Sequence, residues 1–146
     1  MQNFQEFLEN SLQQNIKKLV PLTGGASADI NRIILENNNE LIVRRSLSKE
    51  QSVMAVPKKL EAKIQRIVRS NDAPVPEIIF EFSENEDIGE GYVMEAIPGE
   101  TIPRKILRDD KYKNVRSKLS FEIGRSLATI HQTKLDELTD LDSVTI

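Results

Sequence analysis

Two features of this chain are best suited to chemistry. One is a short glycine turn, Gly24-Gly25-Ala26-Ser27, and the other is a pair of charged residues that follow it, Arg44 and Glu61. A turn without bulky side chains lets backbone N–H groups approach phosphate oxygens closely, and the Ser27 hydroxyl adds a further polar group. Paired glycines also serve any tight turn, so the turn alone leaves a purely structural interpretation open. Its place in the chain, ahead of a basic residue on a strand, favours phosphate binding.

Arg44 lies in an apolar run, Leu41-Ile42-Val43-Arg44-Arg45, that predicts a strand. Strand alternation places Ile42 and Arg44 on the same face. A cation beneath the glycine turn would neutralise phosphates, and Glu61 on the following helix could hold the guanidinium by a charge-assisted hydrogen bond. The alternative is a surface strand end with two arginines, Arg44 and Arg45, and a helix acid that meets only water.

Apolar spacing predicts the elements that position these residues. Repeats of three and four residues predict an amphipathic helix over about residues 3–18, which Pro21 ends. The pattern then changes to three antiparallel strands, placed just before Gly24, at 30–35 and at 41–43. Asn37-Asn38-Asn39 is a credible hairpin turn between the last two, because asparagine tolerates positive φ.

The rest of the chain predicts a helix, two more strands and a long helix. Residues 46–57 are expected to form a flexible connection, and the elements after it are placed at 57–70 (helix), 78–82 and 91–97 (strands) and 114–133 (helix). Pro74-Val75-Pro76 prevents the first helix from continuing, and Pro98-Gly99 ends the last strand. The predicted fold class is therefore α+β: a five-stranded antiparallel sheet with a helix inserted between its third and fourth strands.

Composition excludes several kinds of site. The 146 residues carry a net charge of −3, so bulk electrostatics predict neither nucleic acid nor an anionic membrane as partner. The chain has no cysteine, and its one histidine, His131, excludes a multi-histidine metal site. No secretory signal and no run of about 18 apolar residues is present. These features predict a cytoplasmic protein.

Several segments, in order, resemble a known family. They are Leu22-Thr23-Gly24-Gly25-Ala26-Ser27, Leu41-Ile42-Val43-Arg44-Arg45, Ala73-Pro74-Val75-Pro76, Tyr92-Val93-Met94-Glu95 with Gly99-Glu100, and Leu127-Ala128-Thr129-Ile130-His131. Together they are similar to the amino-terminal lobe of the aminoglycoside phosphotransferase-type kinases. The branch with the best resemblance includes the kinase-like domain fused to some acyl-CoA dehydrogenases. The resemblance covers about residues 18–134.

This resemblance implies a protein-kinase-like fold whose small lobe holds ATP, as Mg-ATP in an intact enzyme. It implies that Gly24, Gly25, Ala26 and Ser27 cover the phosphates. By the same match, Arg44 takes the usual lysine position, Glu61 is the helix glutamate, and Met94, Glu95 and Ile97 belong to the hinge, with backbone groups of Glu95 and Ile97 binding adenine. The implied organisation is an N-terminal helix (1–18), a nucleotide-binding lobe (19–98), a linker (99–113) and the first helix of a second lobe with an acidic tail (114–146).

Two departures from the family stand out. Arg44 replaces a lysine, which retains the charge but changes the geometry of phosphate contacts. More seriously, the family's catalytic loop of the His-Gly-Asp type is missing, because His131 is followed by Gln132-Thr133-Lys134. The late acids Asp136, Asp140 and Asp142 are expected to form a solvated tail, which cannot hold magnesium in fixed geometry. We therefore expect neither a catalytic residue nor a metal ligand in this chain.

Two functions follow from these patterns. The first is the ATP-binding lobe of a kinase-like phosphotransferase that acts on a small-molecule hydroxyl, truncated before its catalytic loop and inactive alone. The second is a non-catalytic binding or regulatory module, derived from such a lobe, that docks onto a partner chain. The expected partners are a nucleotide, the missing C-terminal lobe or a partner chain, and a second copy through self-association. The phosphate acceptor stays open.

Overall fold

The computed structural model describes residues 3–22, 29–47, 56–85 and 87–134. Its elements in chain order are α1 (Phe4–Leu12), β1 (Ile16–Pro21), β2 (Asp29–Leu35), β3 (Glu40–Ser46), α2 (Lys58–Ser70), β4 (Ile78–Ser83), β5 (Glu90–Glu95), α3 (Pro103–Arg108), the 3₁₀ turn η2 (Asp110–Tyr112), α4 (Lys113–Arg116) and α5 (Leu119–His131). All neighbouring strands pair antiparallel in one sheet of order β1-β2-β3-β5-β4. The predicted α+β class, with a helix inserted between the third and fourth strands, is confirmed.

The chain divides into two compact units. The first contains Met1–Arg66 and Pro76–Ala96, and the second contains Ile67–Val75 and Ile97–Ile146. The whole sheet, α1 and the first part of α2 therefore belong to the first unit. No helix in the described part of the chain combines the length and apolar character that crossing a bilayer requires.

The β2–β3 hairpin turns where the asparagine triplet predicts. Asn38 has φ of 64°, a left-handed conformation that asparagine accepts better than most residues. The Leu35 N–H donates to the Asn39 carbonyl and the Asn38 N–H donates to the Leu35 carbonyl, each at 2.9 Å. This turn sets the register that pairs Ile30 with Arg44.

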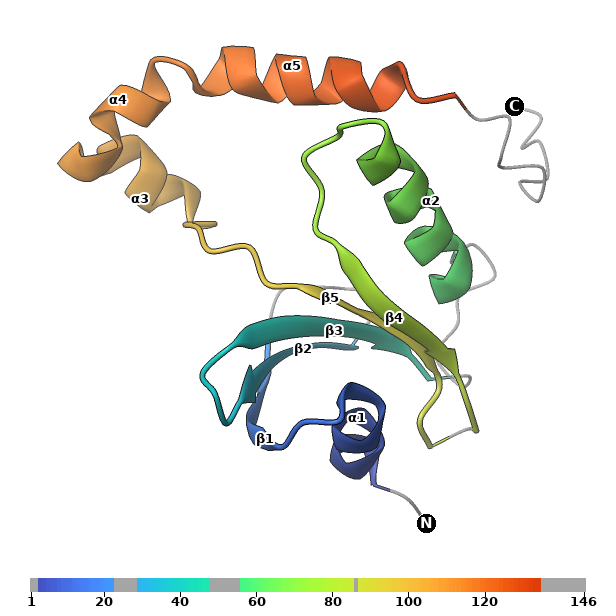
Figure 1. Cartoon of the computed structure of the whole chain (residues 1–146). Helices are drawn as coiled ribbons and strands as arrows, with labels where there is room; N and C mark the ends of the chain where they lie inside the picture. The colour runs from blue at the N-terminus through green and yellow to red at the C-terminus, as the bar shows by residue number, and fades with distance from the viewer. Residues whose placement is uncertain (1–2, 23–28, 48–55, 86, 135–146) are drawn as a thin grey trace. The chain divides into compact units, whose positions relative to one another are not determined.

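Helices cover both faces of the sheet in the first unit (Figure 1). One face packs against α1, where Leu8 joins Ile33, Val43 and Val93 in the larger core. The opposite face packs against α2 in a smaller core of Ala62, Ile78 and Tyr92. The burial of apolar area on both sides is what fixes the sheet between the two helices.

The N-terminal helix is shorter than the sequence predicts, and the expectation of a helix to residue 18 is wrong. The helix ends at Leu12, and Gln13 follows with φ of 54° and a backbone N–H bonded to the Glu9 carbonyl. Ile16 continues the helical spacing in sequence, yet it begins β1 and is buried opposite Leu35. Pairing with β2 and burial in the core stabilise the strand more than one further helical turn would.

The long helix predicted over residues 114–133 is also wrong in extent, because it is divided into α4 and α5. Ser117 and Lys118 separate the two helices. The charged connection before them is partly helical, in α3 and η2. The Arg116 guanidinium donates to the carbonyls of Ile106 and Asp109 at 3.1 and 2.9 Å, which satisfies acceptors at the end of α3 and ties α4 to it. This contact is non-local, so helical periodicity did not indicate it.

Candidate functional site

The predicted phosphate turn, Gly24-Gly25-Ala26-Ser27, lies outside the described residues. So do residues 48–55 of the expected flexible connection and the acidic tail from residue 135 onward. The structure describes the strands on both sides of the turn: the Leu22 N–H donates to the Ile30 carbonyl at 2.8 Å, which carries the β1–β2 pairing to the edge of the turn. The role of these four residues stays a prediction.

Arg44 and Glu61 form the salt bridge that the sequence predicts. Arg44 Nε donates to Glu61 Oε2 at 2.9 Å, and a second guanidinium nitrogen lies 3.5 Å from Oε1. β3 positions the arginine and the first turn of α2 positions the acid. Each side chain is only 23% exposed, so the pair is screened less than a surface pair would be. The interpretation of the two residues as independent surface groups is therefore wrong.

Two further side chains donate to the same carboxylate. Lys58 Nζ lies 2.5 Å from Glu61 Oε1, and the Tyr92 hydroxyl lies 3.2 Å from Oε2. Sequence reasoning missed Lys58, although its position three residues before Glu61 on a helix was a usable signal. Tyr92 is buried, and its cross-strand pairing with Arg44 brings its hydroxyl to Glu61.

The charges of this cluster are set by mutual hydrogen bonds. Burial would raise the pKa of the Glu61 carboxyl, but hydrogen bonds from Arg44 and Lys58 outweigh that effect and hold the pKa below its usual value. The hydrogen bond to Glu61 raises the pKa of Arg44. Burial, reinforced by the charge of Glu61, raises the pKa of Tyr92 to about 12. At neutral pH Glu61 is therefore ionised beside a charged Arg44, and the Tyr92 phenol is neutral.

An apolar surface lies beside Arg44 on the same face of the sheet. Ile30 pairs with Arg44 across the β2–β3 ladder, and Ile42 lies two residues before Arg44 on β3. Leu22, whose N–H donates to the Ile30 carbonyl, lies just beyond the end of β1 and extends the surface. Within the described chain, none of the three belongs to either buried core, and all are at least partly exposed. We call Leu22, Ile30 and Ile42 the apolar platform.

Sequence reasoning identified Ile42 as a neighbour of Arg44 but missed the other two platform residues. Leu22 and Ile30 are separated from Arg44 by a turn and a hairpin, and their shared face follows from the pairing register. The signal was present in the strand alternation on each side of the asparagine turn. Strand alternation could have placed Leu22 and Ile30 beside Arg44 only if the pairing register of the strands had been known in advance.

The residues assigned to the hinge lie at the end of β5 and just beyond it. Met94 is half-buried and pairs with Ile42, so it borders the apolar platform. The Glu95 N–H donates to the Glu77 carbonyl at 2.9 Å, so an adenine contact from the Glu95 backbone would have to use its carbonyl oxygen. Ile97 is exposed and belongs to the second unit, at the start of its longer segment. The adenine contacts of Glu95 and Ile97 stay predictions.

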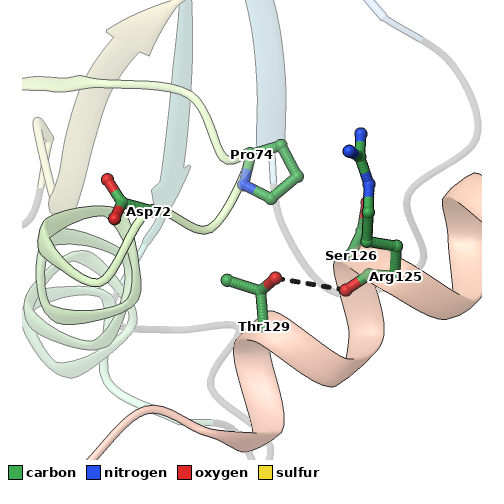
Figure 2. Close-up of a pocket in the computed structure, with 5 residues that line it drawn as sticks. All are labelled: Asp72, Pro74, Arg125, Ser126 and Thr129. Carbon is green, nitrogen blue, oxygen red and sulfur yellow. Dashed lines mark hydrogen bonds between the residues drawn. The ribbon is translucent and has the colours of Figure 1, made fainter.

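The second unit contains a cavity of about 260 Å³ lined by Asp72, Pro74, Arg125, Ser126 and Thr129 (Figure 2). The Thr129 hydroxyl donates to the Arg125 carbonyl at 3.1 Å. The Arg125 guanidinium is paired with Glu122 at 2.6 Å on the same helix. Asp72 and Arg125 are exposed, so water screens their charges and the cavity lacks the buried cation of the Arg44 cluster.

No set of three or more acidic or histidine side chains in the described ranges could together hold a metal ion. His131 ends α5, and Asp136, Asp140 and Asp142 lie outside the described residues. The cluster around Arg44 is therefore the site with the strongest physical case, because it joins a half-buried cation to an apolar surface.

Comparison with known proteins gives one family match. A family model described as the phosphotransferase enzyme family matches residues 18–144, which is most of the chain. The search of curated proteins found no match to this chain. The matched range includes Arg44, Glu61 and β2 to β5 completely. The match does not address the branch fused to acyl-CoA dehydrogenases, which stays a prediction.

Proposed function

The chain belongs to the phosphotransferase enzyme family, and from this premise we propose that its first unit binds the ATP of a phosphoryl transfer to a small-molecule hydroxyl. The observation that carries the proposal is the position of Arg44: Glu61 holds the guanidinium at 2.9 Å while the apolar platform lies beside it on the same sheet face. Such a surface offers a cation for phosphates and an apolar contact for a purine.

The roles of the residues follow from their chemistry. Arginine has five N–H donors in a planar fork, so Arg44 can donate two parallel hydrogen bonds to phosphate oxygens. Ile30 and Ile42 would pack against the base and exclude water from one side of it. Gly24, Gly25, Ala26 and Ser27 would supply backbone donors to the phosphates. Bound ATP would supply the phosphoryl group. This unit would contribute Arg44, whose positive charge would neutralise the negative charge of the phosphates.

We assign no catalytic base in this sequence. Its single histidine, His131, is followed by glutamine, and no His-Gly-Asp segment occurs. Positioning and charge neutralisation supply most of the catalysis in phosphoryl transfer, but the hydroxyl nucleophile must also be oriented. The chain alone is therefore proposed to bind nucleotide without transferring its phosphoryl group.

The test compares two adjacent arginines on opposite faces of the sheet. The melting temperature of the full chain should rise with added Mg-ATP. Arg44→Gln should weaken the Kd for Mg-ATP about tenfold to a hundredfold, as expected for the loss of a hydrogen bond to a charged group. Arg45→Gln is the matched control, since Arg45 pairs with Asp29 at 2.8 Å and lies over the Phe4 ring on the other face.

Arg45→Gln should lower the melting temperature without ligand but keep the rise with Mg-ATP. If the wild-type chain shows no rise, or if the two variants lose it equally, the nucleotide site is not where we place it. Equal loss would point to a general loss of structure and not to a phosphate contact.

A second candidate function, a non-catalytic module that docks onto a partner chain, is favoured by α5. This helix turns half-buried polar side chains (Glu122, Ser126 and Thr129) towards the rest of its unit. Its apolar side chains Ile123, Leu127 and Ile130 are exposed instead. An apolar stripe that faces outward is typical of a surface that another apolar surface covers.

Dye binding and sedimentation test this second function. Wild-type protein should enhance the fluorescence of a hydrophobic dye or associate as its concentration rises, and Leu127→Gln should reduce both effects. Lys118→Gln, at an exposed polar position just before α5, is the control and should change neither. A wild-type chain that stays monomeric at every concentration and binds no dye would remove the basis for docking.

A further inference from the structure

Lys58 is a charged residue that the proposed nucleotide contacts do not use, yet only 2% of it is exposed. Its ammonium donates to the Val56 carbonyl at 3.3 Å as well as to Glu61, and its backbone N–H donates to Glu90 Oε1 at 3.1 Å. Burying an ammonium group is costly unless it is paired and hydrogen-bonded. The chain retains this charge at the start of α2, directly beside the Arg44–Glu61 pair.

Each oxygen of Glu61 has a different shortest contact, although a second guanidinium nitrogen of Arg44 also lies 3.5 Å from Oε1. Oε1 takes its short contact from Lys58, while Oε2 accepts from Arg44 Nε and from the Tyr92 hydroxyl. Lys58 and Arg44 approach from different elements, α2 and β3. The carboxylate is therefore neutralised twice, and the three charged groups together retain one positive charge.

This arrangement matters for any phosphate that competes for Arg44. If Glu61 had only Arg44 as its partner, turning the guanidinium towards a phosphate would leave a partly buried carboxylate without a cation, which is unfavourable. With Lys58 in place, the Glu61 carboxylate keeps a short, charge-assisted hydrogen bond while Arg44 turns towards the phosphate. Lys58 itself is too deeply buried to reach a ligand, since only 3% of its side chain is exposed.

We propose that Lys58 is a positioning residue that neutralises Glu61 and thereby releases Arg44 to bind a polyphosphate. The inference rests on the proposed nucleotide site and adds a residue to it. It differs from a purely structural role for Lys58, in which the ammonium only anchors the first turn of α2. A structural role predicts a loss of stability, whereas the positioning role predicts that the effect of Lys58 on phosphate binding depends on Glu61.

A double-mutant cycle separates these roles. The Kd for tripolyphosphate and for Mg-ATP is measured by calorimetry for wild type, Lys58→Met, Glu61→Gln and the double variant, at a temperature where each is folded. Lys58→Met should weaken binding of both probes about tenfold, because Glu61 then retains Arg44. In the Glu61→Gln background the same substitution should change the Kd less than about twofold, since no carboxylate charge is left to compete.

Two further variants keep the test decisive. Lys59→Met is the matched control: it removes the same charge from the next position of α2, where the side chain is exposed, and should leave both Kd values unchanged. If Lys58→Met does not fold, Lys58→Gln replaces it, because the amide keeps a donor for Glu61 and removes only the charge.

The possible failures are distinguishable. A wild-type chain that binds neither probe overturns the proposed nucleotide site itself. If wild type binds but Lys58→Met binds equally well, only the role of Lys58 is wrong. An equal loss in the wild-type and Glu61→Gln backgrounds also overturns it, because Lys58 would then act independently of the carboxylate.

Discussion

Gly91→Ala is expected to lower the free energy of unfolding by about 3 kcal/mol, the upper part of the range for overpacking a close-packed site. A Cβ at position 91 would lie 2.6 Å from the Arg44 carbonyl oxygen, 2.6 Å from the Phe82 ring and 2.9 Å from Arg45 Cβ. The Phe82 ring can shift, but a backbone carbonyl inside a sheet cannot rotate away. β3 would have to move, and Arg44 would move with it. Urea denaturation measures the loss.

Gly124→Ala is the matched control for this substitution. Nothing lies within 4 Å of a Cβ added at Gly124, which sits inside α5. Alanine is favoured over glycine in a helix interior, so this variant should be as stable as wild type or more stable by about 0.5–1 kcal/mol. If Gly91→Ala matches Gly124→Ala in stability, β5 does not pack this closely against β3.

Leu8→Ala should destabilise the chain by about 3 kcal/mol, within the range for buried leucine truncations. Leu8 is 0% exposed and is the residue through which α1 enters the larger core beside Ile33 and Val43. α1 has nine residues, too few for an isolated helix to be stable in water. Its helical structure therefore depends on this contact, and circular dichroism should show helix loss together with the lower urea midpoint.

Leu107→Ala provides the comparison, because Leu107 lies in α3 with 64% of its surface exposed. Removing the same atoms there should change the free energy of unfolding by less than about 0.5 kcal/mol. Equal losses for the two leucines would contradict the assignment of α1 to the core. An unchanged midpoint for Leu8→Ala would do so as well.

Local patterns in the sequence are sufficient for the type and order of the main elements. Period-two alternation identifies the strands and places Ile42 and Arg44 on one face of β3, as the pairing confirms. The asparagine triplet indicates the hairpin because the required φ is a local property of Asn38. Helical spacing also predicts the helix α2 that carries Glu61. The Arg44–Glu61 pair was one of two alternatives that the amino-acid sequence left open, and the salt bridge in the structure decides between them.

Properties that depend on distant segments were decided by the tertiary structure alone. The spacing from Leu12 to Ile16 is helical, yet pairing with Leu35 makes Ile16 part of a strand. The burial of Lys58 follows from the position of α2 against the sheet, and a lysine on a helix is otherwise expected in water. The apolar platform joins residues of β2 and β3 with Leu22, just beyond β1, and no single segment encodes their register. Periodicity describes a segment's own conformation, whereas contacts across the sheet set which side chains are buried and which stay exposed.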